Sequence, residues 1–293
     1  MGHRGLFVGL TTLDLIYGVT HLPHANEKQV ATEFEIAAGG PATNAAVTFR
    51  HLGNAAILLS GIGQHSVTGL IRADLDAQQV QSYDLLPERM DAPPLSSITV
   101  TQQNGDRAVV CRNALNWQAS PECIPADCLR DVDVVLVDGH QIKVSVTIAK
   151  SARQRGIPVV LDGGSWKVGL EKVLPFVDYA ICSADFLPPG CTTQAEVIQF
   201  LLGAIAQPNI AITRGGESIQ YVCGEQVGEV AVVPIAPVDT LGAGDAFHGA
   251  FCHWILQVPF GEAVREAGTI AALACQEFGT RSWLERVSAE NRR

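Results

Sequence analysis

One carboxylate, Asp245, stands among small residues near the start of an expected helix. It belongs to the stretch VDTLGAGDAF at residues 238–247, and apolar residues follow it at helical spacing as far as Ile255. The first N–H groups of a helix are unpaired and can hold an anion such as a phosphate. Beside a phosphate, a carboxylate suits one task in particular, which is accepting a proton from an attacking hydroxyl. The plainer interpretation is a helix start capped by Asp239 or Thr240, which leaves Asp245 unexplained.

A second glycine-rich stretch, AGGPATNAA, occupies residues 38–46. Gly39 and Gly40 allow the backbone to approach a ligand closely, and Pro41 suits the first position of a helix. Asn44, one turn into that helix, offers both a donor and an acceptor toward the helix start. The alternative is an ordinary turn followed by a helix, with Asn44 in solvent.

Two further candidate sites follow expected strands. Asp14 comes after the first strand, where a carboxylate can accept hydrogen bonds from two sugar hydroxyls, although a lone Asp is also a common turn residue. Gly215 and Gly216, in the segment TRGGE, could offer backbone amides to a nucleotide phosphate, with Arg214 adding charge. A hairpin turn is the alternative there. The chain has no Walker-type phosphate loop, and the single GAG at 242–244 is a poor match to a dinucleotide fingerprint.

Short apolar runs alternate with helical patterns along most of the chain. The expected strands are 6–10, 56–60, 132–137, 158–161, 179–182 and 210–213, and the expected helices between them are 42–52, 69–79, 144–155 and 195–205. This alternation predicts an α/β fold with a mostly parallel sheet covered on both faces. Residues 219–222 and 227–232 indicate a hairpin, and helices are expected at about 243–256 and 261–278.

Three segments alternate like exposed strands and do not fit a parallel run. They are residues 28–36, 97–101 and 107–111, the last two joined through a turn at 104–106. We expect them to form a small separate sheet that acts as a lid. No linker or repeat interrupts the chain, so residues 1–293 are expected to form one domain, with lid strands inserted at about 12–37 and 86–112.

Composition narrows the classes of function. The 293 residues are 47% hydrophobic and 17% charged, as expected for a well-folded soluble protein, and the net charge of −10 argues against nucleic-acid binding. No targeting or membrane-spanning segment is visible, and the eight Cys form no Cys-x-x-Cys pair. Because the His residues are scattered as well, a zinc site is not expected. These features favour a cytoplasmic location.

The two glycine-rich stretches together resemble the ribokinase-like (PfkB) family of sugar kinases. The markers are GGPATNAAVTFRHLG, beginning at residue 39, and VDTLGAGDAF, and the resemblance extends from Val8 to about Phe278. It implies a doubly wound αβα sandwich with a small β lid. It also implies an ATP-dependent phosphotransferase that uses Mg²⁺ and, in some members, a monovalent cation such as K⁺.

The resemblance assigns roles to matching positions. Asp245 would be the catalytic base, with an anion hole at its helix start. That anion hole would comprise Gly242, Ala243 and Gly244. The sugar would contact Asp14, Gly39, Gly40 and Asn44. The ATP phosphates would lie near Ser183, Thr213, Gly215 and Gly216, and Asp239 is the candidate for a monovalent cation.

Within the family, the sequences of residues 9–31 and of the DTLGAGD motif are similar to those of ketohexokinase and sulfofructose kinase. Lys28 is then placed where a lid cation would meet the far end of the sugar, and Arg107 could supply charge there or be a solvated lid residue. Two departures concern metal handling. His65 follows GIGQ where the family often has Asp, and SADF at 183–186 replaces the common Asn-x-x-Glu.

The function expected from these residues is transfer of the γ-phosphate of ATP to a primary hydroxyl of a small sugar or sugar acid, with a ketohexose favoured. One alternative is a sugar-binding regulatory protein that kept the fold and lost phosphoryl transfer. Another is a kinase of a nucleoside or vitamin precursor, although the N-terminal half has few aromatic residues for stacking on a ring. Exposed strand edges seek partners, so the lid strands are candidates for a homodimer contact, and a monomer is the alternative.

Overall fold

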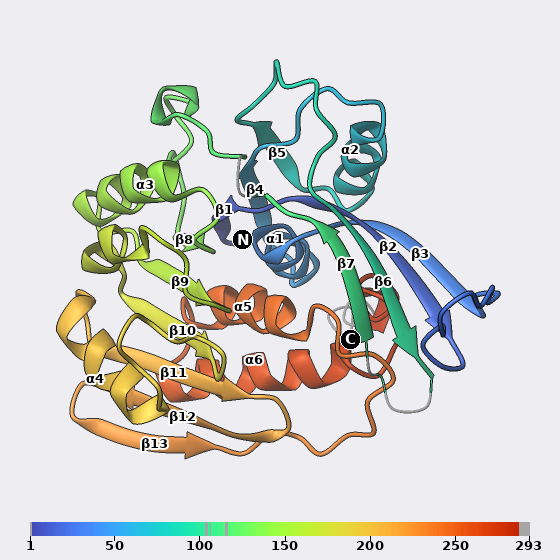
Figure 1. Cartoon of the computed structure of the whole chain (residues 1–293). Coiled ribbons are helices and arrows are strands. Elements are labelled where there is room, and N and C mark those ends of the chain that lie inside the picture. The colour runs from blue at the N-terminus through green and yellow to red at the C-terminus, as the bar shows by residue number, and fades with distance from the viewer. Residues whose placement is uncertain (1, 103–104, 106, 115–116, 287–293) are drawn as a thin grey trace.

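A nine-stranded sheet forms the centre of the molecule in the computed structural model, which describes residues 2–102, 105, 107–114 and 117–286. Its strand order is β13-β12-β11-β10-β9-β8-β1-β4-β5, and the pairs from β11 to β5 are all parallel (Figure 1). The hairpin β12–β13 is antiparallel. The parallel strands are β1 (Arg4–Gly9), β4 (Ala55–Ser60), β5 (Gln81–Asp84), β8 (Val134–Val137), β9 (Val159–Gly163), β10 (Tyr179–Ser183) and β11 (Asn209–Arg214).

Two buried clusters of apolar side chains lie on the two faces of this sheet. Successive residues of β1 show why: Phe7 joins one cluster, while Leu6 and Val8 join the other. Strands that are buried on both faces consist of continuous apolar runs, and for that reason they could be predicted from the sequence. The expected αβα fold is thereby confirmed, with strands closely matching the predicted ranges.

The helices cover both faces. Helix α1 (Pro41–His51) packs on α5 (Ala243–Trp254), which packs on α6 (Phe260–Ala274), and these three supply the first cluster. Helices α3 (Ile142–Gln154) and α4 (Gln194–Ala204) supply the second. The remaining elements are α2 (Thr68–Ala77), β12 (Glu217–Cys223), β13 (Gln226–Val230) and the 3-10 turns η1 (Pro121–Cys123), η2 (Leu170–Lys172) and η3 (Leu174–Phe176). None of the helices among the described residues has the length and apolar content that a membrane span requires.

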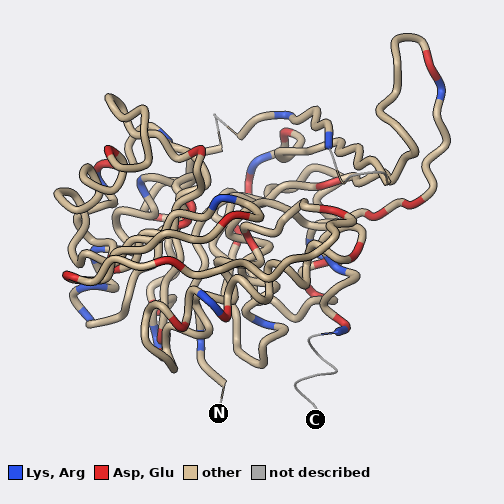
Figure 2. The backbone as a smooth tube through the Cα atoms, turned by 90° about the horizontal axis from the view of Figure 1, so that it is seen from below, with Lys and Arg blue, Asp and Glu red and all other residues tan. Residues whose placement is uncertain are grey.

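A separate four-stranded sheet has the order β3-β2-β6-β7. Its strands are β2 (Thr12–Val19), β3 (Glu33–Gly39), β6 (Leu95–Thr101) and β7 (Arg107–Arg112). The strand predicted at 28–36 is partly wrong, because residues 25–32 form turns and loop and the strand begins at Glu33. The loop between β2 and β3 projects from the body of the molecule at the far right of Figure 1 and the upper right of Figure 2. Of the turn predicted at 104–106, only Gly105 lies within the described residues.

The order of the main sheet reverses at β1, because β4 follows on one side and β8 on the other. Ligands of open α/β sheets bind beyond the carboxyl ends of strands at such a switch point. Asp138, directly after β8, is fully buried there and accepts hydrogen bonds from the backbone N–H groups of Leu10 (2.8 Å) and Ala42 (3.2 Å). This carboxylate joins the ends of β1 and β8 to the start of α1, and it thereby anchors the glycine-rich stretch 38–46 at the switch point.

Candidate active site

Asp245 lies in the first turn of α5, and the residues before it leave room for a ligand. Gly242 caps the helix with a φ of 72°, a left-handed conformation that favours glycine. A Cβ added at Gly244 would meet no atom within 4 Å. The backbone at this helix start is therefore open, which suits the anion hole predicted for residues 242–244.

Asn44 of α1 and Asp245 of α5 are joined directly, although 201 positions separate them in the chain. The side-chain N–H of Asn44 donates to Oδ2 of Asp245 at 2.8 Å. The Asn44 carbonyl oxygen in turn accepts from Arg281 at 3.0 Å. The two glycine-rich stretches thus meet through one hydrogen bond, which orients the carboxylate of Asp245.

Arg281 is a residue of this site that the sequence analysis missed. Its guanidinium donates to Asn44, to Oδ2 of Asp74 in α2 (3.0 Å) and to the carbonyl of Ala38 in β3. It is largely buried, and the backbone N–H of Ala38 also donates to Asp74 at 2.9 Å. One cation therefore ties α1, α2 and β3 together behind the Asn44–Asp245 pair. Nothing near Arg281 in the sequence marks this role, because Asn44, Asp74 and Ala38 are all distant from it along the chain.

The environment of Asp245 raises its pKa to about 7. Burial is the largest cause, and the negative charge of Asp162 is the next. The hydrogen bond from Asn44 and the nearby His248 act in the opposite direction, and Asp14 adds a smaller upward effect. A carboxyl group that titrates near neutrality has the proton affinity expected of a general base at physiological pH.

Asp162, at the end of β9, is the second carboxylate of the site. It is buried, its Oδ1 accepts from the N–H of Gly164 (3.0 Å), and its Oδ2 lies 3.4 Å from Nδ1 of His248. That contact is not a hydrogen bond, because His248 Nδ1 is paired with the carbonyl of Gly244 at 2.6 Å and Nε2 with the carbonyl of Ile181 at 3.1 Å. Among the described groups, Asp162 Oδ2 therefore lacks a hydrogen-bond partner. A buried carboxylate oxygen of this kind fits a water molecule or a hydrated Mg²⁺, so Asp162 is the residue best suited to hold that ion.

The residues predicted to contact the sugar surround the same point. Asp14 follows β1 as expected and lies inside the lid strand β2, where it is buried and accepts from the Thr12 hydroxyl at 2.7 Å. Burial raises the pKa of Asp14, against the lowering effect of hydrogen bonds from Thr12 and Ser96. A Cβ at Gly39 would overlap the Asp14 carboxylate, so these two residues are in direct contact. Gly40 has a φ of 96° and caps α1.

The two basic residues predicted on the lid occupy different surroundings. Arg107 of β7 donates to the hydroxyl of Thr240 at 3.1 Å, so the lid touches the loop that leads into the anion hole. Lys28 is exposed on the loop between β2 and β3, which projects away from α5 (Figures 1 and 2). In this conformation Lys28 is separate from the cluster of Asp14, Asn44 and Asp245.

The residues predicted beside the nucleotide line the carboxyl ends of β10 and β11. The Ser183 hydroxyl donates to the carbonyl of Gly164 (2.8 Å), and Thr213 donates to the carbonyl of Cys182 (3.4 Å). Gly215 and Gly216 form an open turn where an added Cβ would meet no atom within 4 Å. Arg214 is directed elsewhere, because its guanidinium donates to the carbonyl of Ser218 and contacts Glu217 and Glu229.

Asp239, the candidate ligand of a monovalent cation, is buried in the loop before α5. Its Oδ1 accepts from the N–H of Leu241 (2.8 Å) and its Oδ2 from the N–H of Gly279 (3.0 Å). These bonds fix the shape of the loop that ends at Gly242. Binding of K⁺ at Asp239 remains a prediction.

Comparison with known proteins agrees with the geometry. Residues 4–286 match the model of the pfkB family of carbohydrate kinases, and the chain belongs to that family. It is therefore an ATP-dependent carbohydrate kinase, as the sequence analysis expected. The chain is 24% identical to a ribokinase of Bacillus subtilis (93% of this chain, 92% of the relative) and 25% identical to a deoxyribokinase of Salmonella typhi (94% and 93%).

Solved structures share the whole architecture. A crystal structure of a putative ribokinase from Agrobacterium tumefaciens has a TM-score of 0.82 at 25% identity and covers 100% of both chains. Arabidopsis thaliana ribokinase complexed with ribose and ATP has a TM-score of 0.76 at 20% identity, with 98% and 99% covered, which shows the shared fold. These relatives support the family and do not single out ketohexokinase or sulfofructose kinase.

Proposed function

We propose that this kinase transfers the γ-phosphate of ATP to a primary hydroxyl of a small sugar or sugar acid, with Asp245 as general base. One observation carries the proposal. The carboxylate of Asp245 stands at an open helix start, is held by Asn44, and has a pKa near 7. Few roles other than proton transfer require a carboxylate to be buried beside an anion site in this way.

In this proposal the acceptor hydroxyl lies beside Asp245, which takes the proton as the oxygen attacks. Asn44 keeps Oδ2 of Asp245 in place, and the open N–H groups of residues 242–244 stabilise charge on the transferring group. ATP would supply the phosphoryl group, and an Mg²⁺ ion held near Asp162 would supply positive charge for its phosphates. Arg107 on the lid adds a cation close to Thr240 and limits access of water when the lid is closed.

The sugar is proposed to lie between Asp14, Gly39 and Asn44. Asp14 offers a carboxylate for two neighbouring hydroxyls, and the lack of a side chain at Gly39 allows close approach of the ring. We propose a ketohexose as the favoured acceptor, because the sequence of residues 9–31 resembles ketohexokinase. The names of the relatives make pentoses the main competitors, since they include ribokinases and deoxyribokinases. Lys28 would reach the far end of the sugar only if the projecting loop moved inward.

The decisive experiment measures ADP formation with ATP, Mg²⁺ and a panel of acceptors, both in the parent and in the Asp245→Asn variant. The panel contains fructose, ribose, 2-deoxyribose, a keto-deoxy sugar acid and a sulfosugar. We expect one acceptor class to give sugar-dependent ADP, and Asp245→Asn to lower kcat by ~10²–10⁴-fold with folding intact. A variant with kcat within a few-fold of the parent would refute the base role.

The same assay, extended to a nucleoside and a vitamin precursor, separates the alternatives. Sugar binding in a thermal-shift assay without any ADP formation would favour a regulatory protein. That alternative is motivated by His65 and by SADF at 183–186, where the sequence differs from the family pattern. ADP formation only with a nucleoside or a vitamin precursor would show that the protein is a kinase of that class of acceptor. A structure of adenosine kinase from Sinorhizobium meliloti has the same fold (TM-score 0.81, 17% identity), so the fold alone does not exclude that class.

A further inference from the structure

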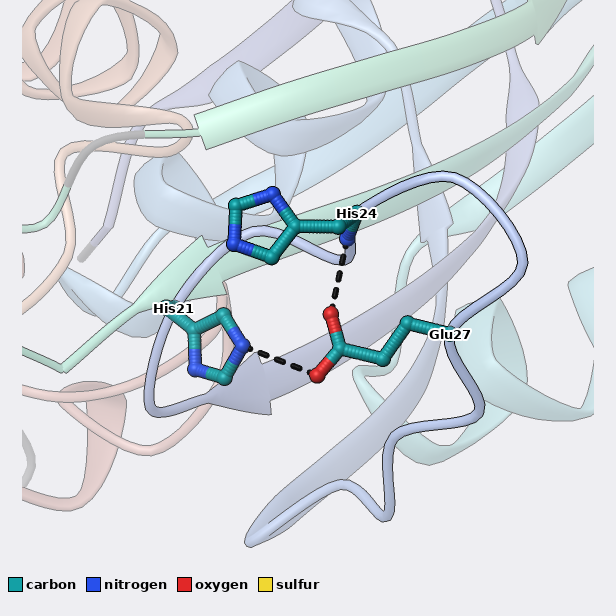
Figure 3. A group of neighbouring side chains, drawn as sticks. All are labelled: His21, His24 and Glu27. Carbon is teal, nitrogen blue, oxygen red and sulfur yellow. Dashed lines mark hydrogen bonds and ion pairs between the residues drawn. The ribbon is translucent and has the colours of Figure 1, made fainter.

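The loop between β2 and β3 brings three metal-ligating side chains together outside the kinase site. They are His21, His24 and Glu27, spaced three residues apart, and all three are exposed (Figure 3). One ligand atom from each lies within 4.8 Å of the other two. Two imidazoles and one carboxylate are a ligand set that Zn²⁺ uses, with water in the fourth position. No zinc site was expected from the sequence, because the His residues are scattered along the chain as a whole. The three-residue spacing of His21, His24 and Glu27 was not recognised as a possible ligand set.

We propose that His21, His24 and Glu27 bind one Zn²⁺ ion. The closest pair already has nearly the right separation, since Nε2 of His21 lies 3.0 Å from Oε1 of Glu27. Two ligands of a tetrahedral Zn²⁺ at ordinary bond lengths are about 3.4 Å apart. In Figure 3 both rings and the carboxylate face a common space, which rotation of the His24 side chain can close around an ion.

The loop backbone holds the carboxylate in position. The N–H of His24 donates to Oε2 of Glu27 at 2.8 Å, and the N–H of Glu27 donates back to the carbonyl of His24 at 3.1 Å. Asn26 between them has a φ of 63°, which makes the tight turn. Oε1 of Glu27 is thereby left to face His21.

Neighbouring polar groups can select the tautomer of His21 that binds a metal. Its Nδ1 lies 3.1 Å from the Thr20 hydroxyl, and the amide of Gln29 donates to that hydroxyl at 3.1 Å. With Nδ1–H donating to Thr20, the lone pair of Nε2 faces the Glu27 carboxylate and is free to bind a cation placed between them. Metal-binding imidazoles commonly donate their other N–H to an oxygen in this way. The Gln29 amide also lies 3.3 Å from Nδ1, and when it donates there, Nε2–H donates to Glu27 until a metal ion displaces that proton.

The test is equilibrium dialysis or calorimetry of the full chain with Zn²⁺ after treatment with a chelator. We expect one Zn²⁺ per chain with a dissociation constant of about 1 µM or tighter. His21→Ala, His24→Ala and Glu27→Gln should each weaken binding by ~10-fold or more. The matched controls are Glu33→Gln, an exposed carboxylate in the adjoining strand, and His65→Ala, and both should bind as the parent does.

Co²⁺ provides a second readout, because its visible absorption reports ligation by nitrogen and oxygen in a tetrahedral site. Loss of that spectrum in His24→Ala, with retention in Glu33→Gln, would support the assignment. Equal Zn²⁺ affinity in the parent and in the variant that lacks all three ligands would overturn it, as would the absence of binding to the parent at ~100 µM Zn²⁺. All these readouts are independent of kinase activity, so they stand or fall separately from the proposed function.

Discussion

At the scale of single residues, the charge of Asp162 tunes the proposed base. The proposed base role requires Asp245 to be ionised, and its pKa is raised to about 7, so kcat/KM should increase as the pH rises through 7. Asp162→Asn removes the neighbouring negative charge, which should lower the pKa of Asp245 and move this limb of the pH profile to lower pH. The measurement is the pH dependence of kcat/KM, with Asp127→Asn, an exposed carboxylate, as control. A limb that stays in place or moves to higher pH would contradict the assigned charge effect.

Arg281 acts through Asn44 as a positioning residue. We expect Arg281→Met to lower kcat by up to ~10²-fold, because a small displacement of a catalytic group has a cost of that order. The same change leaves Asp74 without its cation, so thermal unfolding must first define conditions in which the variant is folded. Arg286→Met, which removes a surface ion pair with Glu277, should behave as the parent. Unchanged kcat in folded Arg281→Met would show that Asn44 needs no such support.

At the scale of elements, the distance between α1 and α5 decides whether Asn44 reaches Asp245. Gly249 permits that distance, because an added Cβ would overlap the carbonyl of Ala45 and approach Cβ of Thr48 to 2.7 Å. Gly249→Ala should therefore destabilise the fold by about 1–3 kcal/mol and lower kcat as well. Gly203→Ala is the matched control, because nothing lies within 4 Å there and alanine favours a helix by about 0.5–1 kcal/mol. Urea unfolding and steady-state kinetics measure both effects, and equal stability of the two variants would refute the close contact.

At the scale of the whole molecule, the lid sheet ends in an edge strand that is exposed throughout. All residues of β7 are exposed, including Val110 at 77% and Val109 at 48%. A long edge strand with apolar side chains favours pairing with another copy, so we expect a dimer through the lid. Sedimentation velocity should show the dimer in the parent and a monomer in Val110→Asp, whose fold should be preserved. A parent that remains monomeric at high protein concentration would exclude this assembly.

The sequence alone determined most strands of the main sheet, most helix bounds and both glycine-rich stretches. Buried parallel strands must be apolar on both faces, and helix starts need small or capping residues, so these features leave a local record. The strand β5 was not predicted, and the start of β3 was predicted too early in the chain. Both strands are partly exposed, and their patterns of apolar residues are weak.

Only the tertiary structure decided which distant residues meet. The Asn44–Asp245 bond spans 201 positions, Arg281 reaches Asp74 across 207, and the raised pKa of Asp245 depends on Asp162 from a different strand. These contacts join α1, α2, α5 and the end of β9, which are far apart in the chain and come together only when the helices pack on the sheet. The position of a residue in the chain specifies its local conformation, whereas its electrostatic environment is set by neighbours that folding alone supplies.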